Sequence, residues 1–334
     1  MARYHVYGVG NALVDLEYEV PESLLGELGI DKSLMTLIEE TRHHELLERL
    51  EGIECRPCGG GSAANTMVAV AQLGGSAFYS CKVADDESGH FFVADLAANG
   101  LETNLDDDAL EAGLTGKCII LITPDAERSM NTFLGITRAL SPAALDEAAI
   151  RDSAHVYIEG YLVPEVDARA AAVRAANVAR EAGVPVALTL SDVNMVRFFG
   201  DGLREIIGPG LDMAFANEEE AREMFGTDSI EASVAAMRGI ATRFAITRGA
   251  RGAVLFDGRD TIEVPAERVS AVDATGAGDL YAGAFLHALT HGMDFAASGA
   301  LAGAAATALV TRVGARLSAE ELRTIGRRFG AGAG

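Results

Sequence analysis

The chain contains 334 residues, of which 49% are hydrophobic, and its formal net charge is −22. This length and hydrophobicity suffice for a large buried core, and no uncharged apolar run of about 18 residues predicts a membrane span. The acidic balance, with only three lysines, excludes nucleic acid and anionic membranes as expected partners, because both require clustered cations. The first residues lack the features of a secretory signal, so we expect a cytoplasmic protein.

The N-terminal third of the chain is predicted to interleave short strands with short helices. A first strand leads into Gly10-Asn11-Ala12-Leu13-Val14-Asp15, in which Leu13 replaces the third glycine of a dinucleotide-binding fingerprint. Asn11 and Asp15 instead place an amide and a carboxylate at a strand end, where open α/β sheets bind ligands; an aspartate that caps a turn is the alternative. Further strands, expected to form one small separate sheet, are predicted at 14–20, 34–38, 53–58, 117–124 and 128–135.

From about residue 75 onward, apolar strands alternate with amphipathic helices, which predicts a parallel sheet covered by helices on both faces. The strands are predicted at 76–83, 155–159, 185–190, 212–216, 243–248 and 252–257. The helices are predicted at 85–99, 165–182, 195–207, 217–226, 229–240, 276–291, 294–313 and 318–328. No linker or internal repeat divides the sequence, so we expect a single domain over 1–334.

The strongest chemical signal is Asp273-Ala274-Thr275-Gly276-Ala277-Gly278-Asp279, a small-residue loop that opens a helix. Its glycines allow a phosphate to approach the backbone closely, and free N–H groups at the helix start bind anions. Asp279, in the first turn of that helix, can accept a proton from an attacking hydroxyl. The combination suits phosphoryl transfer, although an ordinary N-capped loop before a buried helix is the alternative.

A second signal is Cys58-Gly59-Gly60-Gly61-Ser62-Ala63-Ala64-Asn65, which opens an apolar helix. The glycines permit close backbone contact with a ligand, and Ser62 suits a helix N-cap. Asn65, one turn into the helix, is placed to hold sugar hydroxyls. A purely structural turn is an equally good interpretation of this segment by itself.

In their order along the chain, these two motifs resemble the two signatures of the ribokinase (phosphofructokinase-B type) family of carbohydrate kinases. The segments 10–15 and 123–130 resemble its adenosine-kinase-like branch. The resemblance covers essentially the whole chain. It implies a ribokinase-like three-layer α/β/α core with a mainly parallel central sheet, and a small β-lid formed from about 14–58 and 116–137. It also implies an ATP-dependent kinase that is a monomer or a homodimer.

The resemblance implies roles for individual residues. Asp279 would be the catalytic base, and the amides of Gly276, Ala277 and Gly278 would hold the transferred phosphoryl group. The acceptor would be bound by Asn11, Asp15, Gly61, Ser62, Asn65 and Tyr161. ATP and magnesium would be bound by Asn217, Glu220, Thr247, Gly249 and Arg128. The alternative for Asn217 and Glu220 is an ordinary helix N-cap with an acidic first turn, and the alternative for Arg128 is an exposed arginine of a hairpin. A potassium ion would bind at Asp273, Thr275, Gly314 and Ser318.

The acceptor is the least constrained part of the prediction. Tyr161 offers one aromatic face to a purine, but Asn194 stands where the adenosine-kinase-like branch has a phenylalanine. We expect phosphorylation of the primary hydroxyl of an adenosine-like nucleoside, with a sugar kinase of the ribokinase or fructokinase type as the alternative. A non-catalytic nucleoside or sugar sensor is a third hypothesis, against which the intact Asp279 argues.

Overall fold

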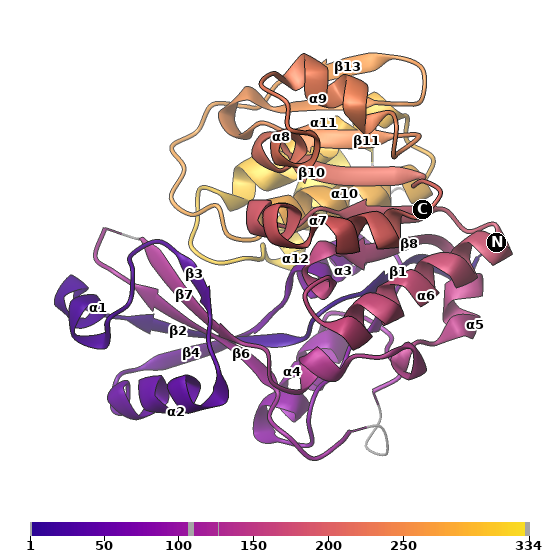
Figure 1. Cartoon of the computed structure of the whole chain (residues 1–334). Coiled ribbons are helices and arrows are strands. Elements are labelled where there is room, and N and C mark those ends of the chain that lie inside the picture. The colour runs from indigo at the N-terminus through magenta and orange to yellow at the C-terminus, as the bar shows by residue number, and fades with distance from the viewer. Residues whose placement is uncertain (1, 106–109, 126, 331–334) are drawn as a thin grey trace.

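Strands that are far apart in the sequence assemble into two sheets in the computed structural model, which describes residues 2–105, 110–125 and 127–330 (Figure 1). The larger sheet has the order β13 (Thr261–Val264), β12 (Ala253–Phe256), β11 (Phe244–Thr247), β10 (Met213–Asn217), β9 (Val186–Thr189), β8 (Ser153–Glu159), β1 (Tyr4–Val9), β5 (Ala77–Ser80). Strands β5, β1, β8, β9, β10 and β11 are parallel, and only the β12 and β13 pairings in this described sheet are antiparallel.

Helices cover both faces of the large sheet, as the alternation of strands and helices predicts. One face carries α5 (Glu147–Arg151), α6 (Val166–Ala182), α7 (Val193–Ile207), α8 (Glu218–Phe225) and α9 (Ile230–Met237). The other carries α3 (Ser62–Gln72), α4 (Glu87–Ala98), α10 (Ala277–Thr290), α11 (Phe295–Leu309) and α12 (Ala319–Arg328). Successive strand residues feed opposite cores: Val156 and Ile158 pack on the first side and Tyr157 on the second. The predicted three-layer α/β/α fold is confirmed.

The smaller sheet projects from one side of this core (Figure 1). Its strands lie in the order β3 (Met35–Leu37), β7 (Arg128–Phe133), β6 (Gly116–Ile122), β2 (Leu13–Glu19), β4 (Cys55–Gly60). Helices α1 (Glu22–Leu28) and α2 (Glu40–Arg49) cover its outer face, where Leu25, Leu46 and Ile119 are buried together. We call this sheet with α1 and α2 the lid. Ala126, in the predicted hairpin turn, and the chain ends at 1 and 331–334 lie outside the described residues.

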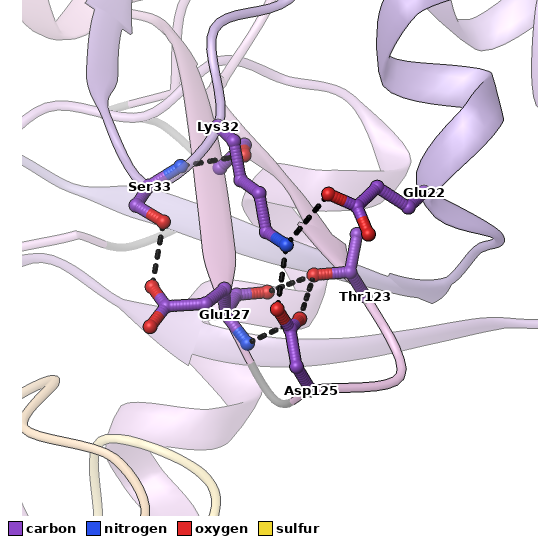
Figure 2. Close-up of polar contacts among 7 residues, drawn as sticks. Glu22, Lys32, Ser33, Thr123, Asp125 and Glu127 are labelled. Carbon is purple, nitrogen blue, oxygen red and sulfur yellow. Dashed lines mark hydrogen bonds and ion pairs between the residues drawn. The ribbon is translucent and has the colours of Figure 1, made fainter.

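Polar contacts hold the far end of the lid together, as Figure 2 shows. Lys32 donates to Glu22 at 2.9 Å and to Asp125 at 2.5 Å, so it joins α1 to the β6–β7 hairpin. Ser33 donates through its hydroxyl to Glu127 at 2.6 Å. These contacts fasten the loop before β3 to the hairpin.

One prediction about the C-terminal half is wrong, and one strand there was missed. The helix predicted at 294–313 ends at Leu309, and residues 310–318 form a loop, because an alanine-rich sequence carries no clear stop signal. Strand β13 was not predicted, since its half-exposed residues Thr261–Val264 follow a polar turn and lack the apolar character of the buried strands. No helix in the described residues is long and apolar enough to cross a membrane.

Candidate active site

The carboxyl ends of the parallel strands and the inner face of the lid enclose a cleft of about 560 Å³. The core side is formed by residues that follow β1, β8, β9, β10 and β11, and by the start of α10. The predicted site residues that line it are Asn11, Asp15, Gly61, Ser62, Asn65, Tyr161, Asn217, Glu220, Thr247, Gly249, Thr275, Gly276, Ala277, Gly278 and Asp279. The fold therefore gathers residues from the whole length of the chain around one cavity.

Asp279 lines this cleft from the first turn of α10, and both of its carboxylate oxygens accept hydrogen bonds. The Ser62 hydroxyl donates to Oδ1 at 2.7 Å, and the Asn65 amide donates to Oδ2 at 3.1 Å. Burial raises the pKa of Asp279, while the hydrogen bonds from Ser62 and Asn65 and the charge of Arg316 lower it. A carboxylate whose pKa is raised by burial is a stronger base toward a hydroxyl proton.

The glycine run before α3 makes room for protein atoms that shape the site. A Cβ on Gly60 would strike the carboxylate of Asp15, and one on Gly61, whose φ is +90°, would strike the carbonyl oxygen of Asn11. Gly61 is itself the N-cap of α3, so the expectation that Ser62 caps this helix is wrong. Ser62 is the first residue of the helix and not its cap, so the Ser62 hydroxyl is free to donate to Asp279.

A buried carboxylate that we did not predict organises the acceptor side. Glu159 accepts hydrogen bonds from the backbone and side-chain nitrogens of Asn11, at 3.3 and 3.0 Å, and from the Ala63 amide at 2.8 Å. Burial raises the pKa of Glu159 to about 7, against these N–H donors, which favour the ionised form. Glu159 therefore ties the end of β1 to the start of α3.

On the nucleotide side, Asn217 and Glu220 form a capping box at the start of α8. The Asn217 side chain donates to Glu220 Oε1 at 2.6 Å and accepts from the Glu220 amide at 2.8 Å. Both residues line the cleft as well, and burial raises the pKa of Glu220 to about 7. The helix-cap interpretation thus holds, and it leaves Glu220 facing the cavity.

The loop before α10 takes a left-handed turn that its glycine permits. Gly276 has a φ of 72°, and a Cβ there would lie 2.5 Å from the carbonyl oxygen of Ala315. The Ala277 amide donates to the Ala274 carbonyl at 3.1 Å. A Cβ on Gly278, in contrast, would meet open space. The first turn of α10 therefore presents its amide end to the cleft.

The residues of the predicted potassium site are only partly brought together. Asp273 accepts from the Thr275 amide at 2.9 Å and the Gly314 amide at 2.8 Å, and it pairs with Arg128 Nε at 3.0 Å. Ser318 is exposed and caps α12, with its hydroxyl bonded to Glu321. A guanidinium already neutralises the Asp273 carboxylate, so this arrangement does not suit a potassium ion.

Arg128 links the lid to the core. Besides Asp273, it pairs with Glu17 on β2 at 3.0 Å, and it is 8% exposed. Its Nη2 is buried without a hydrogen-bond partner among the described residues. Arg128 therefore fastens the lid to the loop that precedes α10.

Charge is distributed unevenly around the cleft. Five carboxylates, on Asp15, Glu159, Asp192, Glu220 and Asp279, line it, whereas none of the lining residues in the described ranges is a lysine, arginine or histidine. Apart from Asp15 on β2, the lid residues that line the cleft are uncharged and form an apolar wall: Leu13, Met35, Leu37, Cys118, Ile120, Met130, Thr132 and Leu134.

Opposite the lid wall, the core contributes Tyr161, Pro164 and Met195. Asn194 is not one of the lining residues; its backbone N–H donates to the Asp192 side chain at 2.7 Å at the start of α7. Asn194 therefore does not form a wall of the cleft, and the neighbouring Met195 lines it there instead. Methionine fills apolar gaps and contacts ring edges well.

The sequence analysis missed Glu159, Asp192 and Arg316. Glu159 and Asp192 carried a usable signal, since each is an acidic residue at the end of an apolar strand that leads into the site. Arg316 gave none, because its contact with Asn65 spans 251 residues of sequence.

Fold and site together define an ATP-dependent kinase of the ribokinase type, in which the start of α10 lies beside the half-buried carboxylate of Asp279. The chain belongs to the pfkB family of carbohydrate kinases, whose family model matches residues 29–322. As a nucleoside or sugar kinase of this family, it uses ATP as its phosphoryl donor.

Known relatives differ in their acceptors. The chain is 31% identical, over 69% of its length and 73% of the relative, to an ATP-dependent ribose-1-phosphate kinase of Halopiger xanaduensis. It is 30% identical, over 70% of its length and 74% of the relative, to an aminoimidazole riboside kinase of Salmonella typhimurium. The adenosine kinase structure from Sinorhizobium meliloti superposes with a TM-score of 0.89 at 35% identity, covering 98% of this chain and 99% of that one.

Proposed function

We propose that the protein transfers the γ-phosphoryl group of ATP to the primary hydroxyl of a nucleoside, with an adenosine-like nucleoside as the preferred acceptor. The observation that carries this proposal is the two-sided cleft. Asn11, Asp15 and Asp279 line a polar region, and an uncharged apolar wall from the lid lies in the same cavity. A nucleoside has the same division, because its sugar is hydroxylated and its base presents large apolar faces.

The apolar wall argues for an acceptor larger than a free sugar. Met35, Ile120 and Met130 project from three lid strands into the cleft, and Tyr161 lies on the core side. A nucleobase bound against these side chains would cover apolar surface that a free pentose would leave exposed to water. Burial of such surface contributes about 25 cal/mol per Å² to the binding free energy.

The charge of the cleft argues against a phosphorylated acceptor. The Halopiger relative is named for ribose 1-phosphate, an anion. In this chain, an anionic acceptor would lose its hydration beside Asp15, Glu159 and Asp279, with no lysine, arginine or histidine among the described lining residues to compensate. A neutral acceptor avoids this cost.

In the proposed reaction, Asp279 takes the proton of the primary hydroxyl while that oxygen attacks the γ-phosphorus. The new O–P bond forms as the bond to the β,γ-bridging oxygen breaks, and ADP leaves with that electron pair. Ser62 and Asn65 hold the Asp279 carboxylate at 2.7 and 3.1 Å, which orients it for this proton transfer. Asn11, Asp15, Gly61 and Asn65 would hold the sugar.

The nucleotide would be bound by the opposite end of the cleft. The amides of Gly276 and Gly278 at the start of α10 suit the transferred phosphoryl group, while Ala277 is already partly engaged. Thr247 and Gly249 would contact the phosphates. Glu220 and Asn217 would organise magnesium and its waters, and the ion would neutralise phosphate charge there. Arg128, which was expected at the phosphates, is not among the lining residues, and it would have to leave Glu17 and Asp273 to reach them.

A matched acceptor panel tests the proposal. ADP release would be measured with magnesium and ATP for adenosine, inosine, ribose, fructose and ribose 1-phosphate. We expect turnover with a purine nucleoside, weaker turnover with the free sugars, and none with ribose 1-phosphate. Turnover on free sugars alone would assign a sugar kinase, and preference for ribose 1-phosphate would contradict the charge argument. Acceptor binding without ADP release would instead indicate a sensor.

A further inference from the structure

Behind the candidate base lies a chain of hydrogen bonds that reaches the far side of α3. Arg316, in the loop between α11 and α12, donates through Nε to Asn65 Oδ1 at 2.7 Å. Its Nη1 donates to Asp95 Oδ2, on α4, at 2.6 Å. Asn65 in turn donates to Asp279 Oδ2 at 3.1 Å. Four segments of the chain are therefore linked in series, from α4 to the carboxylate that lines the cleft.

The chemistry of the two neighbours leaves Asn65 a single orientation. A guanidinium carries only donors, so Arg316 requires the amide oxygen of Asn65 to face it. The NH₂ group then points to Asp279, whose ionised carboxylate only accepts. Without the arginine, the amide could turn over and present its oxygen to the carboxylate, which would repel it.

The position of Arg316 is itself built into the fold. Its side chain is 17% exposed and is anchored by the carboxylate of Asp95. A Cβ on Gly59 would strike that carboxylate and would lie 3.1 Å from Arg316 Nη1. The first glycine of the run before α3 is thus required by the Arg316–Asp95 pair.

We infer that Arg316 is a positioning residue for phosphoryl transfer: acting through Asn65, it holds the carboxylate of Asp279 oriented and charged. This inference rests on the proposed role of Asp279 as the base. It assigns a function to a residue that lies outside the cleft lining and belongs to neither of the two sequence motifs.

The charges around Asp279 make this arginine the relevant cation. Burial raises the pKa of Asp279, and the positive charge of Arg316 lowers it. The titratable groups that face Asp279 from the packed elements are Asp15 on β2, Tyr79 on β5, Tyr157 and Glu159 on β8, and Tyr161 beyond β8. All of these are neutral or negative, so loss of Arg316 raises the pKa of Asp279.

The test is the pH profile of kcat/KM for Arg316→Gln, with Arg316→Lys as the rescue and Arg312→Gln as the control. Arg312, in the same loop, pairs with Glu321 at the surface and does not contact Asn65. We expect Arg316→Gln to lower kcat by about 10- to 100-fold. Its acidic limb should move to higher pH by about one unit. Arg312→Gln should keep the wild-type profile.

Arg316→Lys separates charge from geometry. Its ammonium restores the cation but replaces the forked contact to Asn65 and Asp95 with a single point charge. We expect the acidic limb to return toward the wild-type position while kcat stays reduced. This variant carries the test if Arg316→Gln does not fold. Wild-type kcat in Arg316→Lys, or an unmoved limb in folded Arg316→Gln, would overturn the inference, because a merely structural role leaves the limb in place.

A direct titration keeps the inference separate from the proposed function. Wild-type protein that turns over no acceptor would defeat the proposed function. The pKa of the Asp279 carboxyl can then be measured by carbon NMR, with Asp279→Asn to assign the signal. A higher pKa in Arg316→Gln than in the wild type supports the inference, and an equal pKa refutes it.

Discussion

Replacement of Asp279 by asparagine should separate catalysis from stability. Asparagine has the same shape and can keep both contacts: its oxygen accepts from Asn65, and its NH₂ donates to the Ser62 hydroxyl, which turns to accept. It cannot accept a proton. Loss of a general base costs about 10²- to 10⁴-fold in turnover. At about 1.4 kcal/mol per tenfold, this corresponds to a barrier raised by about 3 to 5 kcal/mol.

The stability of the same variant should change in the opposite direction. The folded-state pKa of Asp279 is raised by burial, so its ionised form opposes folding at neutral pH. The neutral asparagine side chain removes that cost, and we expect a Tm equal to or above the wild-type value.

ADP release, acceptor binding by calorimetry and thermal unfolding together check this prediction for Asp279→Asn. Ser62→Ala serves as the matched control, because it removes one contact to the carboxylate but leaves the base in place. Turnover of Asp279→Asn within tenfold of the wild type would refute the assignment of the base. A large fall in its Tm would refute the stability argument.

Three further predictions concern the rest of the site. The free energy of unfolding should fall as pH rises from about 4 to 7. Burial raises the pKa of Asp15 and Glu159 to about 7, so in this range the folded state binds more protons than the unfolded state. A higher Tm at neutral than at mildly acidic pH would contradict this. Gly276→Ala should lose about 1–3 kcal/mol in chemical denaturation, because φ is 72° and its Cβ would strike a backbone carbonyl, whereas Gly278→Ala should be neutral. Arg128→Gln should cost about 3–5 kcal/mol by breaking two buried ion pairs, and Tm within a degree of the wild type would oppose it.

The sequence was sufficient to predict the layered fold and the two motifs at the site, because both depend on local patterns. Alternating strands and helices imply the parallel sheet, and the glycines before Ser62 and Asp279 mark turns that few other residues permit. The end of α11 was mispredicted because alanine continues a helix and gives no signal at Leu309.

What could not be predicted depends on contacts between distant segments. Arg128 was expected at the phosphates, but nothing near it in sequence indicates its pairs with Glu17 and Asp273, 111 and 145 positions away in the numbering of the chain. No local pattern marks Met130 as part of the apolar lid wall, because only the pairing of β3 with β7 places it beside Met35.

The acidic lining of the cleft also bears on the direction of the reaction. In the proposed transfer, the acceptor enters the cleft neutral and leaves it as a phosphate ester with about two negative charges. Those of the five lining acidic residues that are ionised repel this product but not the neutral acceptor. Product departure is therefore assisted by the same charges that select the acceptor, and the monophosphate should be a poor inhibitor and a poor substrate for the reverse transfer.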